Sequence, residues 1–400
     1  MGIETLFTKK RSSSKIKKYA LLIDIGSASV TAAIVFFENN ISTIIATETT
    51  SISILSDLTY YRFEKEMQKA LTTSLNKILK GNSMPFHFIN VCLSSPWYAS
   101  QVRIAKLVRS TPFIASKSIL DDMVKRELNS FEEDEIKTKN LAGDTVRLVE
   151  SQTIRVRLNG YDVVEPVGLS AKELELTIFL SIASERTLRD IEDIISRVYA
   201  APVMFSSFLS MTYLVARDFF PHEENFVLID IGGEVTDISL VKKNGLQQSF
   251  SFPCGKNYIL RRLSECLKRT IPESKTLWAL HAENKTNGVV KERCEDVLVS
   301  AKNEWQTLFQ KALYTASKDL YIPNIILLTV DDDVVGWFSE AITNEQFHQS
   351  LLSGREFKII PMNTTLFQDV LSFGPNVSRS SYITIEAIGV RYYFNNDFTK

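Results

Sequence analysis

Two short segments of the chain, far apart in sequence, share a pattern of residues suited to binding a phosphate. One runs from Leu22 to Thr31 and the other from Leu228 to Ile238. Each has an apolar run ending in aspartate, then a glycine turn with small hydroxylic residues, then a second apolar run. Glycine lacks the Cβ that would block a ligand, and successive backbone N–H groups can surround an anion. The two copies predict paired β-hairpins that grip a nucleotide from both sides.

Composition limits the classes of protein that fit. A chain of 400 residues is long enough for two or more domains. Its 44% apolar and 23% charged residues are typical of a soluble globular protein. The net charge of −1 gives no overall field that would attract nucleic acid, so we expect no nucleic-acid partner.

The cysteines and histidines show no metal-ligand spacing. No pair of cysteines forms a CxxC motif, so the sequence indicates neither a zinc site nor a disulfide framework. Reduced thiols in a cytoplasmic compartment are the preferred interpretation. The cysteines are Cys92, Cys254, Cys266 and Cys294.

The N-terminal segment, residues 1–18, is basic and begins with a short apolar patch. The sequence contains no apolar run long enough for a transmembrane helix and no signal-peptide pattern. One interpretation is contact with an anionic membrane surface, and the preferred one is a frayed basic tail. The residues in question are Ile3, Leu6, Phe7, Lys9 and Lys10.

Patterning predicts the secondary structure of the first half. Residues 19–49 read as a three-stranded meander, and apolar spacing predicts a helix over 63–79. Residues 98–183 read as a strand–helix–strand–strand unit inserted into the first domain. A Ser-x-x-Thr cap begins the helix over 184–200 that returns the chain to that domain.

The second half is predicted to alternate strands and helices around the second glycine turn. Strands are expected at 226–241, 246–252, 324–329 and 358–361, and helices at 207–218, 258–269, 294–320 and 334–343. Residues 272–289 are expected to be irregular, and 382–393 to hold a last strand–helix piece.

These motifs resemble those of the actin-like ATPase superfamily. The inserted block lies where the FtsA family, bacterial actin-like division proteins, carries its SHS2-type subdomain. Residues 165–170 (Glu-Pro-Val-Gly-Leu-Ser) resemble the Pro-x-Gly-Leu-Ser turn of that subdomain, and residues 230–237 resemble the second phosphate motif. The run Gly26-Ser-Ala-Ser-Val30 is closer to the PilM family of pilus-assembly proteins, which shares the architecture.

The resemblance implies an α/β, actin-like (ribonuclease H-like) fold of two domains with an inserted SHS2-type α+β subdomain. The implied boundaries are 19–97 with 184–220 for the first domain, 98–183 for the inserted subdomain and 221–400 for the second domain.

The resemblance also implies a site for ATP with Mg²⁺ between the domains. Asp24 and Asp230 would hold the metal or its waters. In the alternative interpretation, Asp24 only accepts backbone N–H bonds within its turn, and Ser27 and Ser29 are ordinary turn residues. The residues implied to line the nucleotide site are Asp24, Gly26, Ser27, Ser29, Asp230, Gly232, Gly233, Thr236 and Gly336.

Two departures weaken the implied nucleotide site. The family's adenosine motif ends a strand with consecutive glycines, whereas this chain has Val330-Asp331-Asp332-Asp333 before Gly336. Side chains at these positions would fill the space of the base. Glu234 stands where the family has glycine. Its carboxylate is interpreted in one of three ways: it repels the phosphate, it orients a water for hydrolysis, or it faces solvent as an ordinary turn residue. We therefore expect weak or absent ATP binding, no efficient hydrolysis and no assigned catalytic residue.

Three functions follow from the resemblance. The leading one is an FtsA-like adaptor or filament protein of cell division, cytoplasmic and peripheral to the inner membrane, with FtsZ-like partners and self-association into protofilaments. The second is a PilM-like scaffold for type IV pilus assembly that holds a short peptide of a membrane protein. The third is a sugar or acetate kinase, for which Asp190 and Asp193 are the candidate acids. Residues 392–400 lack the amphipathic membrane helix of FtsA.

Overall fold

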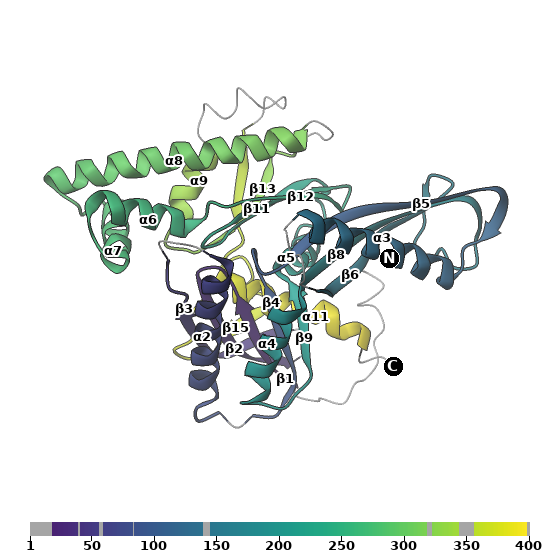
Figure 1. Cartoon of the computed structure of the whole chain (residues 1–400), viewed down its shortest axis with the longest axis horizontal. Coiled ribbons are helices and arrows are strands. Elements are labelled where there is room, and N and C mark those ends of the chain that lie inside the picture. The colour runs from purple at the N-terminus through teal and green to yellow at the C-terminus, as the bar shows by residue number, and fades with distance from the viewer. Residues whose placement is uncertain are drawn as a thin grey trace.

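In the computed structural model, a six-stranded and a five-stranded sheet pack together, and a third sheet projects from them (Figure 1). The structure describes residues 18–38, 41–55, 59–82, 84–138, 145–317, 322–343 and 356–397. The predicted membrane-contact residues Ile3, Leu6, Phe7, Lys9 and Lys10 lie outside these ranges.

The six-stranded sheet has the order β15-β3-β2-β1-β4-β9. It begins with the predicted meander, in which β1 pairs antiparallel with β2 and β2 with β3. Strands β4 and β9 extend it in parallel on the other side of β1. The strands are β1 (Lys18–Ile25), β2 (Ser29–Glu38), β3 (Ile41–Ser51), β4 (Phe86–Leu93), β9 (Val203–Ser207) and β15 (Leu371–Phe373).

Helices cover both faces of this sheet. Helix α2 (Tyr60–Leu79) packs on β2 and β3 beside α4 (Glu185–Ser196), because its apolar residues recur at helical spacing. The predicted cap of α4 is confirmed, since the Ser184 hydroxyl accepts from the Thr187 N–H. Helices α5 (Phe208–Phe219) and α11 (Ser381–Asp397) pack together against the other face.

The five-stranded sheet repeats the strand arrangement of the first. Its order is β12-β11-β10-β13-β14, with β10 antiparallel to β11, β11 antiparallel to β12, and β13 and β14 added in parallel. Each glycine turn therefore joins the central strand of its sheet to the antiparallel neighbour. The strands are β10 (Phe226–Ile231), β11 (Thr236–Lys242), β12 (Gly245–Phe252), β13 (Ile325–Val330) and β14 (Lys358–Pro361).

Successive side chains of β10 point alternately into two different hydrophobic cores. Val227, Ile229 and Ile231 face a core formed with helices α6 (Lys256–Leu267), α8 (Gly288–Ser317) and α9 (Val335–Thr343). Phe226 and Leu228 face the core of the first sheet. Because successive side chains point to opposite faces of a strand, one strand joins both halves of the molecule.

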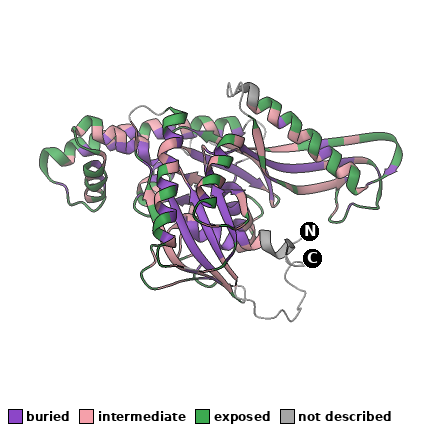
Figure 2. Ribbon diagram, turned by 60° about the horizontal axis from the view of Figure 1, so that its bottom comes forward, coloured by how far each residue is buried: buried purple, intermediate pink, exposed green. Residues whose placement is uncertain are grey.

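The third sheet projects from one end of the molecule and has the order β5-β8-β6-β7. Helix α3 (Lys117–Thr138) covers one face. Alternating apolar residues of β8, such as Leu174 and Ile178, are buried in the core of this sheet. Figure 2 shows that the far end of this sheet is largely exposed. Its strands are β5 (Ala99–Ile114), β6 (Val146–Leu158), β7 (Tyr161–Asp162) and β8 (Ser170–Ser184).

Two sequence expectations were wrong. Residues 272–289, expected to be irregular, contain helix α7 (Ile271–Ala282), which begins with a capping box between Thr270 and Glu273. The expected strand–helix piece at 382–393 lies wholly within α11.

The segments β15 and α11 pack on the first sheet although the sequence assigned them to the second domain. Strand β15 pairs in parallel with β3, and α11 contacts β1 and α5. The Ser42 hydroxyl on β3 donates to the Ala387 carbonyl of α11, 2.7 Å away. Among the described residues, no helix combines the length and apolarity that crossing a bilayer requires.

Candidate functional site

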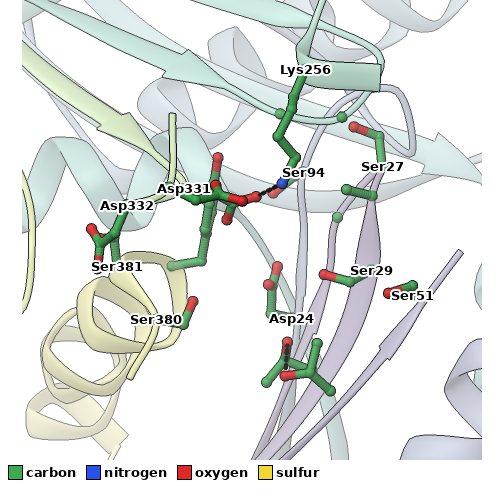
Figure 3. A pocket seen from close by; sticks show the side chains of 18 of the residues that line it. Asp24, Ser27, Ser29, Ser51, Ser94, Lys256, Asp331, Asp332, Ser380 and Ser381 are labelled. Carbon is green, nitrogen blue, oxygen red and sulfur yellow. Dashed lines mark hydrogen bonds and ion pairs between the residues drawn. The ribbon is translucent and has the colours of Figure 1, made fainter. Parts of the chain in front are cut away.

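A cavity of about 440 Å³ lies where the two glycine turns meet (Figure 3). The first turn, the second turn, the start of α6, the aspartates after β13 and the start of α11 all contribute to its wall. Of the residues predicted to bind nucleotide, six line it: Asp24, Gly26, Ser27, Ser29, Gly232 and Gly233.

The first turn is fixed by its own backbone and by Trp97. The Gly26 N–H donates to the Ser29 carbonyl at 3.1 Å, which closes the hairpin. The Trp97 indole N–H donates to the Gly26 carbonyl at 2.8 Å. Ser27 is buried, whereas Ser29 is half-buried beside the cavity.

The second turn is held by the start of α6. The N–H groups of Lys256 and Asn257 donate to the carbonyls of Gly232 and Gly233, at 3.0 and 2.7 Å. A Cβ at Gly255 would lie 2.4 Å from the Gly232 carbonyl oxygen, so only glycine allows this approach.

The two turns touch each other directly. The Glu234 N–H donates to the Ser27 hydroxyl at 3.0 Å. A Cβ at Gly233 would lie 2.8 Å from both the backbone nitrogen and the Cβ of Ala28. The contact between the turns therefore leaves no room for a phosphate between Ala28 and Gly233.

Glu234 is neither a solvent-facing turn residue nor an uncompensated charge beside a phosphate. Its side chain is 5% exposed and makes a bidentate ion pair with Arg261, at 2.6 and 2.9 Å. The Asn257 amide donates to the same carboxylate at 2.9 Å. A buried carboxylate needs a charged partner of this kind, because burying an unpaired charge costs about 3–5 kcal/mol of folding free energy.

The buried carboxylate of Asp24 forms part of the floor of the site, and a second carboxylate is buried close to it. Asp24 is 4% exposed, and its Oδ1 has no hydrogen-bond partner among the described residues. Burial, together with the charge of Asp331, raises the pKa of Asp24 to about 7. Glu386 of α11 is fully buried, and burial and the Asp24 charge raise its pKa well above the usual range.

Asp230 lies near this floor but outside the cavity wall. Burial, followed by the charge of Asp237, raises the pKa of Asp230 well above the usual range, with smaller contributions from Asp24 and Asp331. The Tyr382 hydroxyl donates to the carbonyl of the next residue, Ile231, at 2.9 Å.

Two predicted nucleotide residues lie away from the cavity. The buried Thr236 hydroxyl donates to the Cys254 carbonyl at 2.7 Å and accepts from the Trp305 indole N–H at 3.2 Å. Its hydrogen bonds therefore lie within the core of the five-stranded sheet and not in the cavity. Gly336 is exposed in the first turn of α9, where a Cβ would meet no atom within 4 Å.

Each of the three consecutive aspartates after β13 bonds to a different helix. Asp331 forms an ion pair with Lys256 at the start of α6. Asp332 accepts from the Ser381 hydroxyl of α11 at 3.4 Å, and Asp333 lies 3.7 Å from the Lys275 ammonium of α7. Two of the three carboxylates are therefore compensated by lysines.

These contacts do not fit Mg²⁺ and ATP as the fold family would hold them. The two turns contact each other. Asp331 stands where the resemblance implies a glycine of the adenosine motif, and its carboxylate pairs with Lys256 in the cavity wall. No group of three or more His, Cys, Asp or Glu side chains in the described ranges is arranged to hold a metal. Buried carboxylate oxygens of Asp24, Asp230 and Glu386 have no hydrogen-bond partner among the described residues, and such oxygens suit a cation or a shared proton.

Sequence reasoning missed several residues of the cavity wall. Lys256 lines the cavity and pairs with Asp331, yet its position in the sequence gave no sign of this pairing. The same holds for Arg261, which lies outside the cavity wall and pairs with Glu234. Residues 378–382 also line the cavity, because α11 begins there. Their distance in sequence from both turns left no local pattern to identify them.

Comparison with solved structures identifies the fold. A chain of the "PilM-PilN type IV pilus biogenesis complex" matches with a TM-score of 0.63 and 12% identity, covering 93% of this chain and 98% of that one. The ethanolamine utilization protein EutJ from Carboxydothermus hydrogenoformans matches with a TM-score of 0.42 and 11% identity, covering 97% of this chain and 94% of that one.

Sequence comparisons give no further relative. No protein-family model matches the chain, and no curated protein matches it by sequence. The likeness to the chain of the PilM-PilN complex, together with the repeated strand order of the two sheets, confirms the predicted actin-like α/β fold.

Proposed function

We propose that this protein is an adaptor of the PilM type, which scaffolds a membrane-associated assembly through protein contacts. The observation that carries the proposal is the extent of the structural match. It covers nearly the whole of both chains, including most of the projecting third sheet. The matched chain belongs to a complex with PilN, so the corresponding role here is binding a component of pilus machinery at the inner face of the membrane.

The direct contact between the two glycine turns supports a scaffold in preference to a kinase. A kinase needs an open cleft and a catalytic group beside the substrate. Here the turns are in contact, and the candidate acids Asp190 and Asp193 lie on α4, in a surface groove with residues of α2. The Gln68 amide of α2 donates to Asp190 at 2.8 Å, an ordinary contact between neighbouring helices.

A second cavity, of about 370 Å³, offers a place for the partner segment. It lies at the base of the third sheet, between residues 95–100, Glu135 and the strands β11 and β12. None of the described residues that line it is basic, while Asp237 and Glu135 are acidic and four serines add hydroxyl groups. This chemistry suits a partner segment with a basic side chain.

Affinity capture followed by a matched pair of variants tests this proposal. The tagged chain is expressed in its own cells and crosslinked, and the captured proteins are identified by mass spectrometry. Ser100→Trp fills the second cavity and is expected to lose the partner. Thr72→Trp, on the exposed side of α2, is expected to retain it. Capture of the same partner by both variants would move the binding surface elsewhere.

An FtsA-like role in division is the second candidate. The support for it is the resemblance of residues 165–170 to the FtsA turn. This turn packs beside the start of α3, where the Gly168 N–H donates to the Ala115 carbonyl and the Ala115 N–H donates to the Leu169 carbonyl, both at 2.8 Å. Gene deletion separates the two roles. Loss of pili with normal septa favours the pilus role, and filamentous cells favour the division role.

Membrane contact through the N-terminal basic segment is part of either role. Liposome flotation of the chain with and without residues 2–18 tests it, with vesicles of neutral and of anionic lipid. Flotation that is unchanged by the deletion removes Ile3, Leu6, Phe7, Lys9 and Lys10 from the proposal and leaves membrane contact to the partner.

A further inference from the structure

We propose that Asp331 is an internal substitute for a ligand anion, and that its ion pair with Lys256 keeps phosphate-bearing ligands out of the cleft. This inference rests on the geometry of the cleft and not on the partner of the proposed function. Nucleotide titration and partner capture can therefore fail independently.

Lys256 occupies the position from which a side chain reaches an anion in the cavity. It is the first residue of α6, and its backbone N–H is bonded to the second glycine turn. Its side chain is 10% exposed and extends into the cavity, where its ammonium meets the Asp331 carboxylate (Figure 3). An ammonium buried to this degree requires an anionic partner, and Asp331 provides it from within the chain.

Asp331 is held in place by the residues that follow it. Asp332 is tied to α11 through Ser381, and Asp333 to α7 through Lys275. The Val334 N–H donates to the Asp331 carbonyl at 3.1 Å, which closes a turn across the three aspartates. These contacts fix the backbone of Asp331 at the position from which its carboxylate reaches Lys256.

A phosphate that enters this cleft would be repelled by its carboxylates and would find Lys256 already paired with Asp331. Asp24 faces the same cavity, and Asp331 is close enough to raise its pKa. Replacing Asp331 with a neutral residue removes one negative charge and releases the lysine at the same time. The structure thus predicts a gain of ligand binding from a single neutral substitution.

Calorimetric titration of the full chain with Mg²⁺ and ATP tests the inference. Asp331→Asn is expected to bind ATP at least about tenfold more tightly than the wild type, a change that one released ion pair can supply. Adding Lys256→Met to Asp331→Asn is expected to abolish the gain. Asp190→Asn, on α4 outside the cleft, provides the matched control and is expected to bind like the wild type.

Two results would overturn the inference. One is ATP binding by the wild type that is as tight as binding by Asp331→Asn. The other is a gain in Asp331→Asn that persists when Lys256 is replaced. Thermal unfolding monitors the fold of each variant, and Asp331→Ser, which also leaves the lysine unpaired, replaces Asp331→Asn if that variant does not fold.

Discussion

The Glu234 backbone N–H donates a hydrogen bond to the Ser27 hydroxyl, 3.0 Å away across the cleft. Both groups belong to turns whose sequence is typical of phosphate binding. Here each turn supplies the partner that the other would otherwise find in a ligand. This hydrogen bond connects the two halves of the protein across the cleft, and its contribution to stability can be measured.

Ser27→Ala is expected to lower the free energy of unfolding by about 1–3 kcal/mol, because it leaves the Glu234 N–H buried without a partner. Denaturant unfolding measures the change. Ser29→Ala in the same turn is the control, since this half-buried residue lies at the cavity surface, and it is expected to change the free energy by less than about 0.5 kcal/mol. Equal losses in the two variants would contradict a special role for the contact.

The Glu234–Arg261 ion pair is expected to be the stronger of two adjacent pairs in α6. Arg261→Met leaves a buried carboxylate uncompensated and should cost about 3 kcal/mol. Arg262→Met breaks a pair with the more exposed Glu304 and should cost less than about 1 kcal/mol.

A double-mutant cycle isolates the interaction of this pair. Glu234→Gln combined with Arg261→Met should be less destabilising than the sum of the single substitutions, because the neutral amide no longer needs the guanidinium. Additive losses would show that the two side chains contribute independently to stability.

Replacing two glycines by alanine, one at a time, is expected to change the stability of the protein in opposite directions. Gly233→Ala places a methyl group against Ala28 and should destabilise the protein by about 1–3 kcal/mol. Gly336→Ala meets open space in α9 and should be neutral or stabilising by up to about 1 kcal/mol. A midpoint of thermal unfolding that Gly233→Ala leaves unchanged or raises would contradict the close contact of the turns.

Stability is expected to decrease as the pH rises toward neutrality. The pKa of Asp24 is raised to about 7, mainly by burial, whereas the unfolded residue titrates near ~3.9. Between these values the folded protein retains a proton that the unfolded chain releases, so the free energy of unfolding falls with rising pH. Asp230 and Glu386 act in the same direction.

Asp24→Asn should remove part of this dependence. Between pH 5 and pH 8, the variant is expected to lose less stability than the wild type, by on the order of 2 kcal/mol. Urea unfolding at each pH gives the values. Asp121→Asn, at an exposed position of α3, should keep the wild-type slope. An unchanged slope in Asp24→Asn would show that its proton is not linked to folding.

Local patterns predicted most of the fold. The two glycine hairpins, the apolar spacing of α2 and the alternation of β8 each have one dominant period, and the structure contains the corresponding elements. Helix α7 was missed although Thr270 and Glu273 form a capping box, because its apolar residues lack a clear amphipathic stripe. Strand β9 was missed because it is short and follows directly after the α4 region.

The site was less accessible to sequence reasoning than the fold. The turns themselves were identified, and six of the nine residues predicted to bind nucleotide line the cavity. The partners of those residues come from distant segments, such as Lys256 for Asp331 and Arg261 for Glu234. A charged residue in a helix looks the same in sequence whether it faces solvent or a buried carboxylate, so burial and pairing became visible only in three dimensions.

The return of β15 and α11 to the first sheet affects the order in which the protein can be completed during translation. Strand β15 closes the open edge at β3, and α11 covers a face that otherwise exposes apolar side chains of β1. The second sheet can assemble as soon as residue 361 has left the ribosome, whereas the first must wait for segments made about 350 residues after its opening strand. Until then, the apolar side chains on this face of the first sheet lack their covering helix.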